Sequence, residues 1–161
     1  MATQELPKVR LKSFSYTTGL RWDEGKLGMM SSDGKPEIRI SSPREFKGEP
    51  GHWTPEDLFV GAIEMCQMLT FLALAQKQQL TLVSYKSTAR GTLEFVDSQY
   101  RFTRVVIMPC VTIEAPGTEA MVQTLMKEAH NRCLVANSVT AVVEVNPSVT
   151  VQEATVVGER M

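Results

Sequence analysis

An apolar stretch from Trp53 to Leu80 constrains the fold of this chain more than any other segment. Thr54 is a favourable N-cap, Pro55 is tolerated at the first helical position, and two acidic residues follow where the helix dipole favours negative charge. Apolar side chains then fall on every side of a helical wheel. The sequence therefore predicts a central helix over 55–78, covered on most sides and roughly 36 Å long.

Polar residues within this stretch favour a soluble protein over a membrane protein. Glu64 and Gln67 interrupt the apolar run, which falls short of the roughly 18 uninterrupted apolar residues of a membrane span. The 161 residues, 43% of them hydrophobic, suffice for one well-filled domain, so we expect a single domain over 1–161. A formal net charge of −1 gives no electrostatic sign of binding to nucleic acid or to an anionic membrane.

The cysteines and the N-terminal residues indicate a cytoplasmic protein. The 3 cysteines stand at distant positions and do not form the pattern of a secreted disulfide framework. The N-terminal residues lack the apolar segment of a signal peptide. With no Cys-x-x-Cys pair and only 2 histidines, a structural zinc site is not expected. Cys110 lies in a valine-rich segment and is expected in the core.

The remaining segments alternate between strand and helix patterns. The expected order is βββ-α-ββ-α-ββ, which is typical of the α+β class. The expected elements span 8–18, 26–30, 37–41, 55–78, 81–96, 100–114, 118–130, 140–145 and 148–157. Segment 18–25 is rich in turn-forming residues, and Ser31-Ser32-Asp33-Gly34 is a hairpin-type turn. Gly91 is expected to mark a bulge, and Pro109 an edge or a bulge.

Glu56 and Cys66 are the chemically distinctive residues of the central helix. Ten positions at about 100° each leave their side chains about 80° apart and roughly 15 Å along the helix axis. They could not meet on one straight helix. If both belong to one site, either the helix breaks between them, with Gly61 the expected place, or the site includes a second chain.

Four segments of the chain form a set that resembles a known family. They are Thr18-Gly19-Leu20-Arg21, Ser31-Ser32-Asp33-Gly34, Thr54-Pro55-Glu56-Asp57-Leu58-Phe59 with Cys66 following, and Ala129-His130-Asn131-Arg132-Cys133. Together with the element order, they resemble the OsmC/Ohr family of osmotically inducible and organic hydroperoxide resistance proteins. The resemblance covers nearly the whole chain. It implies an OsmC-like α+β fold, with antiparallel sheets wrapped around a long buried central helix, and an intertwined homodimer.

The resemblance also implies a function, that of a thiol peroxidase reducing organic hydroperoxides to alcohols. Cys66 would be the peroxidatic cysteine and Cys133 the resolving cysteine, and Arg21 with Glu56 would poise Cys66. No cofactor or metal is implied. The implied partners are a second copy of the chain, an organic hydroperoxide and a dithiol reductant such as a lipoylated protein, with neither nucleic acid nor membrane.

These residue types suit that chemistry. A thiolate, not a thiol, attacks the peroxide oxygen, so a nearby guanidinium such as that of Arg21 would lower the pKa of Cys66. The Glu56 carboxylate could orient the guanidinium. The resulting sulfenic acid condenses with a second thiol to give a disulfide. Apolar neighbours of Cys66, such as Phe59, Met65 and Leu69, would favour organic hydroperoxides over hydrogen peroxide.

Two residues depart from the family pattern. Leu134 follows Cys133 where the family often has proline, and Glu64 lies two residues before Cys66. A carboxylate near the thiolate would raise its pKa, but two positions on a helix point about 160° apart, so we expect Glu64 to face elsewhere. The departures leave open a redox sensor or a small-molecule-binding protein of the same fold. Arg44 is an alternative to Arg21, and His130 is expected to be structural.

Overall fold

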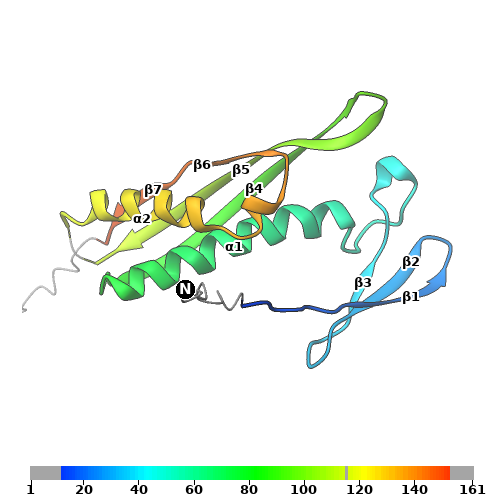
Figure 1. Cartoon of the computed structure of the whole chain (residues 1–161), viewed down its shortest axis with the longest axis horizontal. Helices are drawn as coiled ribbons and strands as arrows, with labels where there is room; N and C mark the ends of the chain where they lie inside the picture. The colour runs from blue at the N-terminus through cyan, green and yellow to red at the C-terminus, as the bar shows by residue number, and fades with distance from the viewer. Residues whose placement is uncertain (1–11, 115, 153–161) are drawn as a thin grey trace, which may run out of the picture. The chain divides into compact units, whose positions relative to one another are not determined.

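The computed structural model describes residues 12–114 and 116–152. Its internal contacts divide the chain into two compact units, Met1–Thr54 and Pro55–Met161. The expectation of a single domain over 1–161 stays a prediction. Along the chain, three strands precede a long helix, two long strands, a second helix and two short strands, and this order confirms the expected βββ-α-ββ-α-ββ succession (Figure 1).

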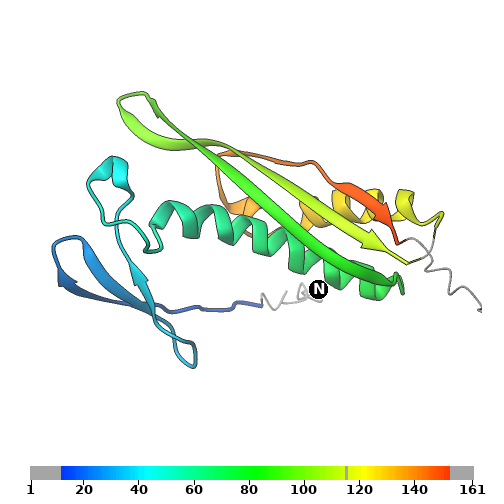
Figure 2. The same ribbon diagram turned by 180° about the vertical axis from the view of Figure 1, so that it is seen from behind.

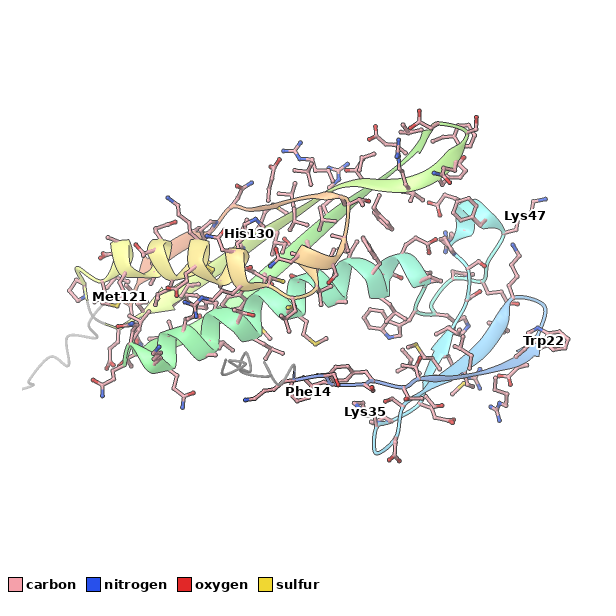
Figure 3. The ribbon with its side chains drawn as sticks, viewed as in Figure 1. Phe14, Trp22, Lys35, Lys47, Met121 and His130 are labelled. Atoms are coloured by element: carbon pink, nitrogen blue, oxygen red, sulfur yellow. The ribbon has the colours of Figure 1, made fainter. Side chains whose placement is uncertain are left out.

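The first unit contains a three-stranded antiparallel sheet. Its strands are β1 (Gly19–Glu24), β2 (Leu27–Ser31) and β3 (Ile38–Ile40), in the order β1-β2-β3, and a short 3₁₀ helix, η1 (Arg44–Phe46), follows. The predicted turn between β2 and β3 is confirmed, because the Lys35 N–H donates to the Ser32 carbonyl at 3.1 Å. At the other turn, the Trp22 indole N–H donates to the Gly25 carbonyl at 3.1 Å (Figure 3).

The first strand lies later in the chain than predicted. Residues 12–18 have no regular structure, so a strand over 8–18 is wrong for its described part, while 8–11 lie outside the described residues. Segment 18–25, predicted as a turn, instead pairs with β2 from Gly19 opposite Ser31 to Glu24 opposite Leu27. Pairing with a neighbouring strand decides this placement, because local strand preference is weaker than the ladder that a neighbour offers.

The second unit is a layer of two helices on one face of a sheet. The helices are α1 (Pro55–Lys77) and α2 (Glu119–Arg132), and the strands are β4 (Leu82–Val96), β5 (Gln99–Ile113), β6 (Val142–Val145) and β7 (Ser148–Val151). Opposite views place both helices on the same side of the strands (Figures 1 and 2). The main core between the layers includes Phe71 of α1, Val111 of β5 and Leu125 of α2.

The sheet of the second unit is mixed, so the expectation of antiparallel sheets holds only for the first unit. β4 and β5 form a long antiparallel hairpin. β6 pairs with β5 in parallel over 104–107, and β7 does so over 110–113. The two short strands follow α2, which returns the chain across the sheet, and a connection of this kind permits parallel pairing.

Pro109 lies in the central strand, not at the edge or bulge that its sequence position predicted. It stands opposite Ser87 of β4, while on its other side β6 has ended and β7 begins at Ser148. The Asn146 N–H donates to Ile107 O at 2.8 Å, and the Ser148 hydroxyl donates to Pro109 O at 3.4 Å. Proline lacks an N–H, and the gap between β6 and β7 requires none there.

Only one face of α1 is buried in the single chain, so one copy of the chain does not by itself provide the cover expected on most sides of this helix. The buried residues are Ile63, Gln67, Phe71, Leu74 and Ala75. On the opposite side, Met65 is 55% exposed and Leu69 is 54% exposed. By length and composition alone α1 could cross a membrane, a property it shares with core helices of soluble proteins.

Two further expectations concern the long hairpin. A Cβ at Gly91 of β4 would lie 2.5 Å from the Val60 side chain, so glycine permits close approach to α1. The irregularity in strand pairing lies beside it, at Thr92 and Leu93.

Cys110 is exposed, not in the core. Odd-numbered residues of β5 from 105 to 113 face the helices, and Cys110 therefore falls on the opposite face of the sheet.

Candidate functional site

The packing of α1 against α2 brings two of the predicted residues, Cys66 and Cys133, together. Cys66 lies half-buried in the middle of α1, and Cys133 is fully buried at the C-terminal cap of α2. The Cys133 sulfur lies 4.0 Å from the carbonyl oxygen of Ile63 on α1. Each of the two thiols shifts the pKa of the other, and all described cysteines are free.

A tight loop after α2 surrounds the Cys133 thiol and leads into the 3₁₀ helix η2 (Ala136–Ser138). The Asn137 N–H donates to Cys133 O at 3.0 Å, and the Ser138 hydroxyl donates to Leu134 O at 2.8 Å. The Ala136 N–H donates to the Cys133 sulfur at 3.4 Å. Carbonyl groups of the loop are thus bonded within the loop, while the Ala136 N–H is directed at the Cys133 sulfur.

Hydrogen bonds from this loop lower the pKa of the Cys66 thiol. Burial raises that pKa, but the backbone N–H of Val135, the Cys133 thiol and the backbone N–H of Leu134 lower it by more in sum. The net pKa therefore lies below the ordinary value of 9.0. Because a donor bonds more strongly to a thiolate than to a thiol, these contacts favour the charged, nucleophilic form.

Cys133 has the opposite tendency. Burial raises the pKa of its thiol to about 11, and the neighbouring Cys66 adds to the rise, against a smaller lowering by the Ala136 N–H. The two sulfurs titrate as a pair, in which Cys66 is the first to lose its proton. Cys66 is therefore the thiol that deprotonates more readily, and Cys133 keeps its proton to higher pH.

Glu56 lies on the same unbroken helix as Cys66. α1 runs continuously from Pro55 to Lys77, so the alternative in which the helix breaks at Gly61 is wrong. Glu56 is half-buried in the first turn, and its Oε2 atom is buried with no hydrogen-bond partner in the described part of the chain. A buried carboxylate oxygen without a partner is costly, which indicates that a donor or cation completes it.

The two candidate arginines belong to the first unit. Arg21 lies in β1, where its Nε atom is 3.2 Å from Asp23 Oδ1 in an exposed ion pair. Arg44 is exposed in η1. The groups that shift the pKa of Cys66 in the described structure all belong to the second unit. A role for Arg21, Arg44 or Glu56 at Cys66 therefore stays a prediction.

Glu64 faces β4, in agreement with the expectation that it turns away from Cys66. The Ser87 hydroxyl donates to Glu64 Oε1 at 2.5 Å and ties α1 to the sheet. Burial raises the pKa of the nearby Tyr85, and the negative charge of Glu64 adds to that rise. The carboxylate is not among the groups that shift the pKa of Cys66.

Sequence reasoning missed the loop donors, Leu134 and Val135. Their backbone N–H groups have no side-chain signature, and the one available signal was that Leu134 is not a proline. Gln67 was left without a role, and it proves to link the helices, because its Nε2 atom donates to Met126 O at 3.2 Å. His130 of α2 (Figure 3) is half-buried, and its Nδ1 atom has no partner among the described residues.

The described residues contain no group of three or more His, Cys, Asp or Glu side chains arranged to hold a metal ion. The thiol pair is thus the clearest reactive feature of the second unit. What this arrangement can do on chemical grounds is lose two electrons at Cys66 and pass the oxidation on to Cys133 as a disulfide.

Comparisons with known proteins agree with the fold and the motifs. The sequence profile of a family described as OsmC-like protein matches residues 48–148. An organic hydroperoxide resistance protein of Xanthomonas axonopodis pv. citri is 31% identical over 144 residues, or 86% of this chain and 92% of that protein. An uncharacterized protein of Bacillus subtilis is 23% identical over 109 residues, or 65% of this chain and 72% of that protein.

Solved structures show the same fold. An OsmC-like protein of unknown function from Vibrio cholerae has a TM-score of 0.79 at 24% identity, over 84% of this chain and 100% of that one. An organic hydroperoxide resistance protein from Legionella pneumophila has a TM-score of 0.66 at 22% identity, over 87% of this chain and 99% of that one. The α+β fold is therefore of the OsmC-like type.

Proposed function

We propose that this chain, which belongs to the OsmC-like protein family, is a cysteine-based peroxidase that reduces organic hydroperoxides to alcohols. Relatives named for organic hydroperoxide resistance support a peroxide-related role. The observation that carries the proposal is the thiol pair, in which hydrogen bonds lower the pKa of Cys66 beside a Cys133 thiol that keeps its proton. The reaction requires this order of the two pKa values, because Cys66 has to be the nucleophile.

In the first step, the Cys66 thiolate attacks the terminal oxygen of the hydroperoxide. A sulfur–oxygen bond forms, the oxygen–oxygen bond breaks, and the alkoxide leaves as the alcohol after taking a proton from solvent. Cys66 is oxidised by two electrons to a sulfenic acid. Exposed apolar side chains beside it in the sequence and one turn along, Met65 and Leu69, suit an organic substituent on the peroxide.

In the second step, the Cys133 sulfur attacks the Cys66 sulfenic acid. A sulfur–sulfur bond forms, the sulfur–oxygen bond breaks, and water leaves. The reduced Cys66 helps to raise the pKa of Cys133, and a neutral sulfenic acid no longer exerts that charge effect. Oxidation of Cys66 thus makes Cys133 easier to deprotonate when its thiolate is needed. A dithiol, such as a lipoylated protein, then reduces the disulfide in the cytoplasm.

We infer that a second copy of the chain completes the site. Met65 and Leu69 form an exposed apolar strip along α1 that an identical subunit would cover. A second copy would also bring a Glu56 carboxylate near Cys66, which one continuous helix prevents. Sedimentation of the wild-type protein should give a dimer, which Leu69→Glu should weaken. Met108→Glu, at an exposed apolar position on the face of the sheet away from the helices, should not weaken it. A wild-type monomer at micromolar concentration would contradict this inference.

A redox sensor of the same fold is the second candidate. The observation that favours it is the departure from the family pattern at Leu134, directly after Cys133. A sensor would form the disulfide slowly and would not catalyse repeated reduction of the hydroperoxide.

Steady-state consumption of cumene hydroperoxide with dihydrolipoamide separates the two candidates. A peroxidase should turn over, lose activity in Cys66→Ser and keep it in the matched Cys110→Ser variant, whose cysteine lies on the opposite face of the sheet. Turnover that survives Cys66→Ser would exclude the proposed mechanism. A single slow oxidation without turnover would favour the sensor.

A further inference from the structure

We propose that Gln67 is a positioning residue for disulfide formation, because its hydrogen bond to α2 fixes where Cys133 lies along α1. The Gln67 Nε2 atom donates to Met126 O at 3.2 Å, and the bond is buried between the two helices. The inference deepens the proposed function and rests on it, since the place of Cys133 matters to the reaction only if oxidation passes to it from Cys66.

Gln67 is the one polar residue among the buried residues of α1. Ile63 and Phe71, one turn before and one turn after it, are fully buried, and Gln67 itself is 1% exposed. Its Oε1 atom has no hydrogen-bond partner in the described part of the chain. A buried polar atom without a partner is costly, and an apolar residue of the same size would avoid that cost. Stability therefore does not explain a glutamine at this position.

The hydrogen bond lies close to both cysteines along the helices. Gln67 directly follows Cys66 in α1. One turn earlier in α1, the carbonyl oxygen of Ile63 lies 4.0 Å from the Cys133 sulfur. Met126 precedes Cys133 in α2 by about two turns. The contacts of Gln67 and Ile63 with α2 thus lie on consecutive turns of α1, and together they set the position of the end of α2.

A directional contact is needed here because apolar packing alone leaves freedom along the helix axis. Flexible side chains such as that of Met126 can contact new neighbours when one helix slides past another. A hydrogen bond from an amide to one carbonyl oxygen is lost when the helices slide. Disulfide formation does not tolerate such a displacement, since the Cα atoms of bonded cysteines usually lie about 4.4–6.8 Å apart. Fixing the relative position of helices is a well-attested use of a buried polar group.

The test begins with two variants of the buried face of α1. Gln67→Met removes the hydrogen bond and the unpartnered oxygen, while it keeps the approximate size of the side chain. Leu74→Met is the matched control, an exchange between apolar residues on the same buried face. Both variants carry Cys110→Ser, so that only Cys66 and Cys133 react. In urea, Gln67→Met should unfold at no lower concentration than its Cys110→Ser parent.

An aromatic disulfide, dithiobis-nitrobenzoate, takes the place of the peroxide, and stopped-flow absorbance follows the release of thionitrobenzoate. The Cys66 thiolate attacks the reagent, forms a mixed disulfide and releases a first thionitrobenzoate. Cys133 then loses its proton to solvent and attacks the Cys66 sulfur, which forms the internal disulfide and releases a second thionitrobenzoate. The second phase does not depend on the reagent concentration and should be absent in Cys133→Ser.

Gln67→Met should slow the second phase by about tenfold or more, because a small misplacement of reacting groups has a large effect on rate. The first phase should stay unchanged, and Leu74→Met should change neither phase. A second phase as fast in Gln67→Met as in the control would overturn the proposal. Equal slowing of both phases would also overturn it, since Gln67 would then act on Cys66 itself.

An equilibrium measurement keeps the proposal testable if Gln67→Met does not fold. The effective concentration of Cys133 toward Cys66 is measured in the Cys110→Ser protein with a glutathione redox buffer. It should lie far above the millimolar range of groups joined by a short flexible linker, and a millimolar value would overturn the proposal. Neither readout involves hydroperoxide. Thiols held in place without peroxide turnover would therefore refute the proposed function alone, whereas turnover with an unchanged second phase in Gln67→Met would refute this inference alone.

Discussion

The Cys133 sulfur lies 4.0 Å from the carbonyl oxygen of Ile63, so the end of α2 is seated on α1 one turn from Cys66. Ile63 is itself fully buried, in a cluster with Val105 and Ile107 of β5. The residue thus joins three elements at the point where the thiols meet. The packing of Ile63 is therefore expected to affect the reactivity of the Cys66 thiol.

Ile63→Ala should lower the free energy of unfolding by about 2–5 kcal/mol, because it leaves a cavity in this cluster. Urea denaturation at fixed protein concentration measures the change, since a dimer's stability depends on concentration. Gln76→Ala, at an exposed position of the same helix, is the control and should stay within about 0.5 kcal/mol of wild type. If Ile63→Ala unfolded at the same urea concentration as the control, Ile63 would not contribute this free energy to the stability of the protein.

The pH dependence of the reaction should reveal the effect of the Cys133 thiol on the pKa of Cys66. Hydroperoxide reduction should rise with pH through the Cys66 pKa, which lies below its ordinary value, and should reach a plateau above it. Cys133→Ala removes one donor, so the rise should move to higher pH. Cys133→Ser keeps a hydroxyl donor and should shift the rise less. The rate of sulfenic acid formation in a single turnover is measured against pH for the wild type and both variants. Identical pH profiles would contradict a contact between the thiols.

Glu64→Gln should leave the pH profile of Cys66 unchanged. The carboxylate is bonded to Ser87 on β4 and turns away from the thiol, so its charge is not expected to oppose thiolate formation. The same change should lower the pKa of Tyr85, since the Glu64 charge contributes to raising it, and an ultraviolet tyrosinate titration reads that shift. A move of the Cys66 profile to lower pH would mean that Glu64 does act on the thiol.

Arg21→Ala should slow hydroperoxide reduction by tenfold or more, on the order expected for loss of a cation that stabilises a thiolate. Arg44→Ala is the matched test of the alternative arginine. Asp23→Ala releases Arg21 from its exposed ion pair and should leave the rate unchanged or raise it. A wild-type rate in Arg21→Ala would show that Arg21 does not stabilise the thiolate.

Cys66 and Cys133 lie on the elements predicted for them, because the cysteines and the helical patterns around them are read directly from the sequence. The spacing of apolar residues predicts one long helix that contains Cys66 and a second helix that ends at Cys133. Both helices and both long strands lie close to their predicted ranges, since each contains a long periodic pattern. Short elements without such a pattern were harder to place, and β1 was found only through its pairing with β2.

Other features could not be inferred from residue types. The donors at Leu134 and Val135 are backbone groups, which every residue except proline possesses. The exposed strip at Met65 and Leu69 has the same composition as the buried face of α1, so apolar residues on all sides predicted burial on all sides. Composition does not say whether the same chain or a second copy provides the cover.

Mass spectrometry of the reduced Cys110→Ser protein after one equivalent of cumene hydroperoxide tests the central claim most directly. The account predicts complete oxidation within seconds, with a loss of about 2 Da and a Cys66–Cys133 disulfide peptide, and in Cys133→Ser a gain of about 16 Da on Cys66 alone. Oxidation no faster than that of a free thiol, or oxidation that leaves Cys66 reduced, would contradict it.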